Sequence, residues 1–260
     1  MPKFCPLFSG SKGNSTYVAT TEGAILIDAG VSAKKLCCAL QDVGVSPDFI
    51  KGIFITHSHS DHIGGLRVFA KKYKIPVYAT AKTVAALKKC DGFECITLNE
   101  IKDNIELAGM SISYFSTPHD CPGSCGYIIS ADSRKIAVCT DVGKVTDDIH
   151  NALCGCDLVM LESNHDVLML ESCAFYSYDL KRRILSDNGH LSNNACAGEV
   201  VRLVESGTTR FVLSHLSENT NLPELALETV RTNMSLSGYV EDVDYSLCVA
   251  SPSNNRVIII

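Results

Sequence analysis

Three histidines and one aspartate occupy a single six-residue stretch of the chain, residues 57–62, which reads HSHSDH. The stretch follows, after Thr56, residues 53–55, an apolar, β-branched and aromatic run typical of a buried strand. If the chain turns there through a tight loop that opens a helix, alternate side chains can face two different ions. Neutral imidazole and carboxylate are ligands for zinc, manganese or iron. The alternative is a polar loop whose histidines only hydrogen-bond their neighbours, but burying so many titratable groups without a cation costs free energy.

Three further candidate ligands stand at the ends of later apolar segments. His119 follows the run at residues 110–117, Asp141 follows residues 135–140, and His215 follows residues 210–213. Taken singly, a histidine in this position is more often structural, and an aspartate is more often a helix or turn cap. Their order after the HSHSDH stretch favours metal binding.

These residues together resemble the five metal motifs of the metallo-β-lactamase superfamily, and the resemblance covers nearly the whole chain. It implies an α/β fold, the four-layer αββα metallo-β-lactamase sandwich, in a single domain over residues 1–260. It also implies two divalent metal ions, either zinc or manganese, with iron as a further option. A hydroxide bridging the ions would be the nucleophile. The implied ligands are His57, His59 and His119 for one ion, Asp61, His62 and His215 for the other, and Asp141 between them, with Asp61 also orienting the hydroxide.

Two more motifs narrow the substrate. LES at residues 161–163 and GHLSN at residues 189–193 resemble motifs of the β-CASP nucleases and the tRNA 3′-end endonucleases of this superfamily, in which a second histidine contacts the scissile phosphate. That resemblance gives His190 a catalytic role. With SGSKGNS at residues 9–15 and ESNHD at residues 162–166, the chain looks most like the YycJ/WalJ group of 5′→3′ exonucleases acting on double-stranded DNA. No gap between motifs could hold an inserted CASP domain, and no long arm is present to clamp tRNA.

The remaining site candidates are polar residues expected to bind phosphate or to support the ligands. The glycines and hydroxyls of residues 9–15 let backbone N–H groups approach an anion, although a flexible turn is equally consistent with them. His190 lies just before a helix N-terminus, where the dipole favours a phosphate. These candidates are Ser11, Asn14, Asp28, Glu162, His165 and Ser192, with Asp28 supporting the histidine loop as in superfamily relatives.

Apolar runs and turn signals predict alternating strands and helices, which favours a layered α/β fold. Helices are expected at residues 32–43, 81–89, 192–205 and 222–234, with Ser32 and Ser192 as N-caps. A further helix of about nine residues is expected after the glycines at 64–65, ending at residue 73. Strands are expected at residues 3–8, 16–19, 24–28, 53–55, 76–79, 94–98, 105–107, 110–117, 126–130, 135–140, 157–161, 210–213 and 257–260.

Composition limits the classes of partner. The net charge of −6 argues against a broad basic surface, so a nucleic acid would have to be held locally by the metals and a few cations. DNA is the expected substrate in preference to RNA. No apolar run is long enough to span a bilayer and the start lacks a secretory signal, so a cytoplasmic protein without membrane contact is expected. The motifs carry no information on oligomeric state.

Thirteen cysteines, an odd number, are scattered through apolar runs, which favours reduced thiols over a disulfide framework. The pairs Cys121/Cys125 and Cys154/Cys156 could also be zinc ligands, but neither has the CxxC spacing. The rival functions are RNA processing of the tRNA 3′-end type and small-molecule hydrolysis by a lactonase, thioesterase or β-lactamase. A small-molecule hydrolase needs none of His165, His190 or the glycine-rich loop.

Overall fold

The computed structural model describes residues 1–260, and its strands form two mixed seven-stranded sheets. By internal contacts the chain divides into two compact units. Unit 1 comprises Met1–Tyr114, Cys121–Arg134 and Ser251–Ile260, and unit 2 comprises Phe115–Asp120 and Lys135–Ala250. The expectation of a single domain over residues 1–260 stays a prediction.

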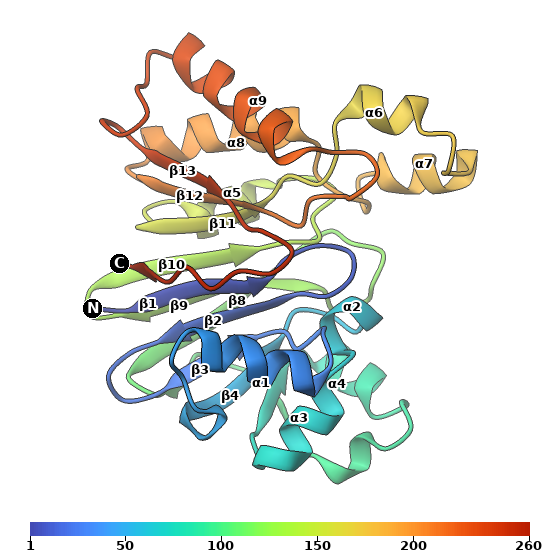
Figure 1. Cartoon of the computed structure of the whole chain (residues 1–260), viewed down its shortest axis with the longest axis vertical. Helices are drawn as coiled ribbons and strands as arrows, with labels where there is room; N and C mark the ends of the chain where they lie inside the picture. Colours follow the sequence, from blue (N-terminus) through green and yellow to red (C-terminus); the bar gives the residue numbers. More distant parts are fainter. The chain divides into compact units, whose positions relative to one another are not determined.

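Unit 1 contains one complete sheet, in which the two ends of the chain pair with each other (Figure 1). The pairing is antiparallel up to β3 and parallel from β3 onward, so β3 and β4 end at the same edge. Ile27 of β3 pairs with Phe54 of β4. That register places Asp28 beside the residues that follow β4. The strand order is β14 (Ile258–Ile259), β1 (Lys3–Phe8), β2 (Ser15–Ala19), β3 (Ala24–Ile27), β4 (Ile50–Ile55), β5 (Val77–Ala79) and β6 (Leu98–Glu100).

The helices of unit 1 cover this sheet with apolar faces. Leu36 of α1, Phe69 of α3 and Leu87 of α4 are fully buried in one cluster with Leu26 and Ile53 of the sheet. Burying each such side chain stabilises the fold by about 1.5–3 kcal/mol. The helices are α1 (Ala33–Asp42), α2 (Ser60–Ile63), α3 (Leu66–Tyr73) and α4 (Ala81–Leu87), with 3-10 turns η1 (Pro47–Phe49) and η2 (Phe93–Cys95). The unit also holds β7 (Ile105–Leu107), β9 (Cys125–Ala131) and most of β8 (Met110–Ser116).

Unit 2 is built on four strands that pair in parallel, β10 (Arg134–Cys139), β11 (Leu158–Glu162), β12 (Arg210–Ser214) and β13 (Ser246–Val249). Leu161 pairs with Cys139 on one side and with Leu213 on the other. The carboxyl ends of β10, β11 and β12 therefore meet at one edge, which is where parallel α/β sheets usually place their functional residues. Asp141, Glu162 and His215 all lie at this edge.

The helices of unit 2 are α5 (Asp147–Leu153), α6 (Val167–Ser172), α7 (Tyr178–Ile184), α8 (Asn193–Glu205) and α9 (Pro223–Leu236). Helix α8 packs on α9 and also contacts α5 (Figure 1). Its N-terminus is fixed by Ser192, whose hydroxyl accepts a hydrogen bond from the Ala195 N–H at 3.2 Å. The predicted N-caps Ser32 and Ser192 are both confirmed.

Most predicted elements are found within a residue or two, but the strand predicted at residues 94–98 is wrong. That segment forms the turn η2, and β6 begins only at Leu98. The backbone at Gly92 is left-handed, with φ +81, and it turns Phe93 into the core instead of continuing an extended chain. Helices α5, α6 and α7 and strand β13 were not predicted, because they are short and their apolar periodicity is weak. No helix in the structure is both long and apolar enough to cross a membrane.

Candidate metal centre

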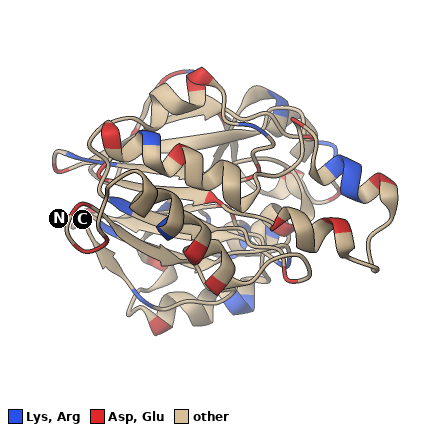
Figure 2. Cartoon of the chain, turned by 90° about the horizontal axis from the view of Figure 1, so that it is seen from above, with Lys and Arg blue, Asp and Glu red and all other residues tan.

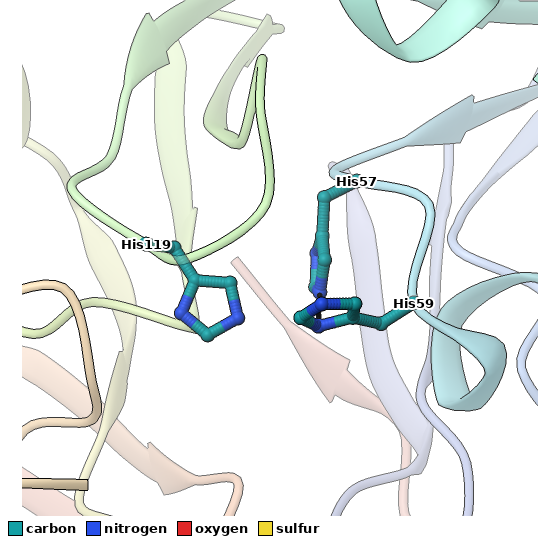
Figure 3. Close-up of side chains that lie close together, drawn as sticks. All are labelled: His57, His59 and His119. Carbon is teal, nitrogen blue, oxygen red and sulfur yellow. Dashed lines mark hydrogen bonds between the residues drawn. The ribbon is translucent and has the colours of Figure 1, made fainter. Parts of the chain in front are cut away.

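The HSHSDH stretch forms a loop that leaves β4 and enters α2, as its spacing predicts. His57 and His62 are completely buried, whereas His59 and Asp61 are partly exposed. His57 Nε2 lies 3.0 Å from His59 Nδ1, and the two rings meet edge to face with centroids 4.6 Å apart (Figure 3). Two imidazole nitrogens at this distance could be ligands of one cation.

Asp28 fixes this loop from behind. Its carboxylate accepts hydrogen bonds from the Thr56 N–H and the Thr56 hydroxyl, each at 2.8 Å, and its Oδ2 lies 2.7 Å from His62 Nδ1. A histidine that donates Nδ1–H to a carboxylate presents its Nε2 lone pair on the other side of the ring, the usual arrangement of a metal ligand. The structure thus places Asp28 in contact with the histidine loop, as expected. Thr56 was missed because a threonine after a strand has no distinctive sequence signal.

Asn14 closes the other side of the loop. Its Nδ2 lies 3.1 Å from His62 Nε2 and 3.3 Å from Asp61 Oδ2, while its Oδ1 accepts the Gly10 N–H at 2.9 Å. The glycine-rich segment therefore touches the candidate ligands through Asn14. Ser11 lies exposed in the same turn, and its role as a phosphate contact stays a prediction.

Gly30 lies where two backbone segments of unit 1 approach each other closely. A Cβ atom added there would lie 1.7 Å from the Asp61 carbonyl oxygen and 2.7 Å from the Asn14 nitrogen. The same segments are joined by hydrogen bonds from the Asn14 N–H to the Asp61 carbonyl at 2.8 Å and from the Ala29 N–H to the His62 carbonyl at 2.9 Å. Only glycine lets the ligand loop sit at this distance.

Gly30→Ala is therefore expected to lower both the free energy of unfolding, by about 3 kcal/mol, and the metal content, because the backbone of Asp61 must move. Gly198→Ala is the matched control, since Gly198 lies in α8 with no neighbouring atom within 4 Å of the added Cβ. The free energy of unfolding of this control should rise by up to about 1 kcal/mol, because alanine favours a helix over glycine. Urea denaturation and elemental analysis measure both effects, and equal behaviour of the two variants would contradict the packing argument.

In unit 2, Glu162 is the centre of a second cluster. Its Oε1 lies 2.8 Å from both His190 Nδ1 and His215 Nδ1, and its Oε2 accepts the N–H groups of Val142 at 2.8 Å and Leu191 at 3.2 Å. The carboxyl is completely buried. Both histidines thus donate Nδ1–H to one carboxylate and present Nε2 away from it.

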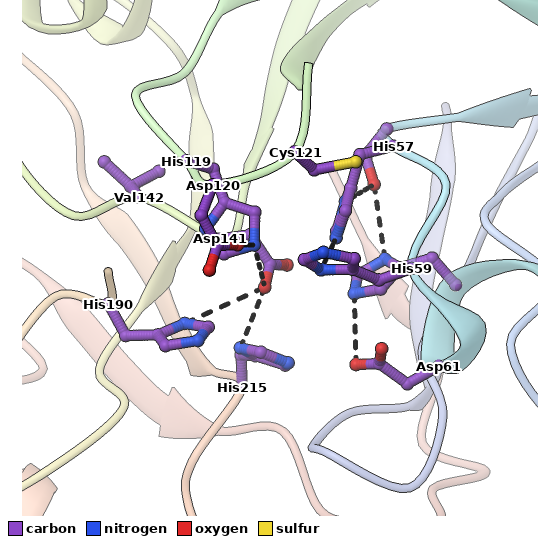
Figure 4. Close-up of polar contacts among 12 residues, drawn as sticks. His57, His59, Asp61, His119, Asp120, Cys121, Asp141, Val142, His190 and His215 are labelled. Carbon is purple, nitrogen blue, oxygen red and sulfur yellow. Dashed lines mark hydrogen bonds and ion pairs between the residues drawn. The ribbon is translucent and has the colours of Figure 1, made fainter. Parts of the chain in front are cut away.

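Asp141 lies beside these rings. Its Oδ1 is 3.6 Å from His215 Nδ1 and 3.8 Å from His190 Nδ1 (Figure 4). One ligand atom from each of Asp141, Glu162, His190 and His215 lies within 4.8 Å of every other. A buried group of two carboxylates and two imidazoles has the chemistry of a metal-binding cluster or of a proton-transfer site.

The charges of this cluster oppose the effect of burial. Burial by itself raises the pKa of Glu162, but the charge and hydrogen bonds of His190 and His215 outweigh it and bring that pKa to about 2. Burial likewise lowers the pKa of His190, yet Glu162 outweighs it, so the net shift is upward. The Glu162 carboxylate therefore raises the pKa of His190 above its ordinary value and holds its Nδ1 in a hydrogen bond.

His119 belongs to the same unit and follows β8. Its Nδ1 lies 3.2 Å from the Gly189 carbonyl, which fixes Nε2 as the lone-pair nitrogen, and Nε2 lies 3.7 Å from Asp141 Oδ1. The neighbouring Asp120 forms an ion pair with Arg183 of α7. His119 and Asp141 are thus brought together as the motif order predicts.

Three site residues have a strained backbone. Asp28, Asp141 and His215 have φ values of 63, 58 and 55, in the left-handed region that residues other than glycine seldom adopt. Such strain persists only where the surrounding structure enforces it, and it concentrates at functional sites. Asp28 and His215 come directly after β3 and β12, and Asp141 follows β10 after one intervening residue, Thr140.

His165 is almost fully buried, with 1% of its surface exposed, and neither ring nitrogen meets a protein hydrogen-bond partner. Burial lowers its pKa to about 4, so the ring is neutral at pH 7. Its carbonyl accepts the Asn193 N–H at 2.9 Å and so holds the start of α8. Its predicted role in supporting the site or binding phosphate stays a prediction.

The donor set fits divalent ions. The Nδ1 atoms of the candidate histidines contact supporting groups: a hydroxyl at His57, a carboxylate at His62 and His215, and a backbone carbonyl at His119. His59 is the exception, since its Nδ1 faces His57. This is the pattern by which supporting groups orient imidazole ligands. Oxygen and imidazole donors without thiolates suit zinc, manganese and iron. None of the thirteen cysteines is in a disulfide, and Cys121 approaches the loop only through the Ser58 hydroxyl, at 3.4 Å.

The chain belongs to the metallo-β-lactamase superfamily, since residues 24–216 match the model of the Beta-lactamase superfamily domain. It is 34% identical over 255 residues to exodeoxyribonuclease WalJ of Streptococcus pneumoniae serotype 2 (strain D39), covering 96% of this chain and 94% of that protein. It is 36% identical over 239 residues to exodeoxyribonuclease YycJ of Bacillus anthracis, covering 91% and 90%.

Among solved structures, the metallo-beta-lactamase fold protein YhfI from Bacillus subtilis superposes with a TM-score of 0.74 at 15% identity, covering 99% of this chain and 98% of that one. This likeness concerns the fold alone. Together the matches confirm the predicted α/β-sandwich fold and the predicted class, a metal-dependent hydrolase. The fold implies divalent metal ions as cofactors.

Proposed function

We propose that the protein is a divalent-metal-dependent phosphodiesterase that degrades double-stranded DNA as an exonuclease from the 5′ end. The observation that carries this proposal is the pairing of His190 with buried Glu162 beside Asp141 and His215. A small-molecule hydrolase needs no additional histidine paired with a buried carboxylate next to its ligands, whereas a phosphodiester has both an anionic phosphate and a leaving oxygen to accommodate.

We assign the ligands as the motifs suggest. His57, His59 and His119 would hold one ion, Asp61, His62 and His215 would hold the other, and Asp141 would serve both. Within unit 1 the loop directs three imidazoles and one carboxylate together, and within unit 2 the strand ends gather Asp141, His119 and His215. Two ions of zinc, manganese or iron would supply Lewis acidity and an activated water when bound.

The other site residues have separate proposed roles in substrate binding, proton transfer and support of the ligands. His190, held by Glu162, binds the scissile phosphate and gives its proton to the leaving oxygen. Asp61 orients the attacking water. Asp28 and Asn14 keep the histidine loop in place, and Ser192 fixes the helix N-terminus that follows His190, where N–H groups and the dipole favour an anion.

The names of the curated relatives support DNA as the substrate, since WalJ and YycJ are both exodeoxyribonucleases matched over nearly their whole length. Charge supports end recognition. Acidic and basic residues are interspersed along the ribbon in Figure 2, and the net charge is −6. A protein with this charge should contact few phosphates, so affinity should fall only modestly with salt. A cytoplasmic location suits this substrate and the reduced cysteines.

Digestion of duplexes labelled at either the 5′ or the 3′ end, with Mn²⁺ or Zn²⁺ supplied, tests the proposal. Early release of labelled mononucleotide from the 5′ end is the expected result, and chelator should abolish it. A tRNA precursor and a panel of lactones and thioesters serve as competing substrates. Cleavage of structured RNA alone, or rapid turnover of the small molecules without any action on nucleic acids, would contradict the proposal.

A further inference from the structure

Away from the metal centre, three side chains of unit 2 stand in a row between α5 and α8, two helices in contact (Figure 1). Cys154 is the residue that ends α5, His150 lies one turn before it, and Glu199 comes from the middle of α8. The Cys154 Sγ is 3.4 Å from His150 Nε2, and His150 Nδ1 is 2.7 Å from Glu199 Oε1.

The order of these atoms defines their chemistry. His150 donates Nδ1–H to the Glu199 carboxylate, which makes Nε2 the basic nitrogen and aims it at the thiol. Glu199 is itself fixed, because it is 2% exposed and its other oxygen accepts from Arg202 NH1 at 2.9 Å. A nucleophile, a base and a carboxylate that orients the base form the arrangement by which proteins activate a thiol.

The other cysteines have different surroundings. Burial raises the pKa of Cys125 and Cys196 to about 12 and that of Cys156 to about 11, so these thiols stay protonated and inert. Exposed Cys90 donates a weak hydrogen bond to the Ala86 carbonyl, which is not a base that can deprotonate the thiol. Cys154, by contrast, is partly exposed and faces an imidazole. Lys135 adds a positive charge nearby, since its Nζ donates to the Cys154 carbonyl at 3.3 Å.

We propose that Cys154 is a thiol modification site that reacts with low-molecular-weight disulfides. His150 takes the thiol proton, and the Cys154 sulfur attacks one sulfur of the disulfide. The new S–S bond forms as the old one breaks, and the departing thiolate receives the proton from His150. The products are a mixed disulfide at Cys154 and one molecule of free thiol, so the disulfide is the only co-reactant.

The test measures the rate at which each cysteine of the full-length protein becomes glutathionylated by oxidised glutathione at pH 7, using peptide mass spectrometry. Cys154 should react about tenfold faster than the more exposed Cys38 and Cys90. An equal or slower rate at Cys154 would overturn the proposal.

Two variants separate activation from mere exposure. His150→Asn and Glu199→Gln should each slow the reaction at Cys154 about tenfold while the rates at Cys38 and Cys90 stay unchanged. Glu199 is buried, so its variant could unfold locally, whereas His150 is 18% exposed and tolerates replacement better. An unaltered rate in folded His150→Asn would show that the imidazole does not activate the thiol and would overturn the assignment.

Discussion

Replacing His190 by alanine is expected to slow hydrolysis of duplex DNA by a factor of about 10² to 10⁴ while the metal content stays at the wild-type level. The reason lies in the two hydrogen bonds of Glu162. His215 and His190 both donate to its Oε1, but the motif order assigns His215 to a metal and leaves His190 for the substrate. Single-turnover rates at saturating metal, with elemental analysis of the same samples, measure the two effects separately.

The pH dependence gives an independent check. Glu162 raises the pKa of His190, so the imidazole stays protonated above its ordinary range near 6.5 and loses its proton only as the pH rises further. The wild-type rate should therefore fall on the alkaline side, and this fall should be absent from His190→Ala. His150→Ala is the matched control, since it removes another partly exposed histidine bound to a buried carboxylate, and it should turn over normally. Loss of metal from His190→Ala would make His190 a ligand and refute this division of roles.

Asp141→Asn is expected to reduce the metal content to less than one ion per chain and to lower activity with it. The substitution keeps the size of the side chain and tolerates the left-handed backbone at φ 58, so it changes chiefly the charge. Asp141 is buried among His119, His190 and His215, and under the proposed assignment a neutral amide could not replace a carboxylate that would serve two cations. Asp132→Asn is the control, because Asp132 also has a left-handed backbone, at φ 50, but lies exposed in a hairpin. Full metal content in Asp141→Asn would contradict the assignment.

The sequence predicted the strands that position the site because their signals are strong and local. Residues 53–55 and 158–161 are uninterrupted apolar runs followed by polar, chemically distinctive residues, and this pairing of strand and motif needs no knowledge of distant contacts. The candidate ligands within each unit were found in the same way. Asp28 was placed correctly behind the histidine loop only through the resemblance.

Other features depend on contacts that a sequence does not display. Thr56 acquires its role because β3 and β4 pair in a register that brings it to Asp28. Glu162 acquires its role because parallel neighbours end at the same level, so that one carboxylate reaches two histidines from different loops. The sequence also could not predict the cluster of Cys154, His150 and Glu199. Helix α5 was not predicted, and Glu199 lies 45 positions beyond Cys154 in the sequence.

The metal content of wild-type protein purified without chelator tests the central claim most directly. Elemental analysis should find close to two divalent ions per chain, because the proposed ligands form two sets that would share Asp141. Asp141→Asn measured alongside should hold less than one ion. A metal content near zero in the wild-type protein would contradict the assignment of a metal-dependent nuclease if it stayed near zero after reconstitution. Reconstitution here means adding zinc or manganese, removing the unbound metal by gel filtration and repeating the analysis.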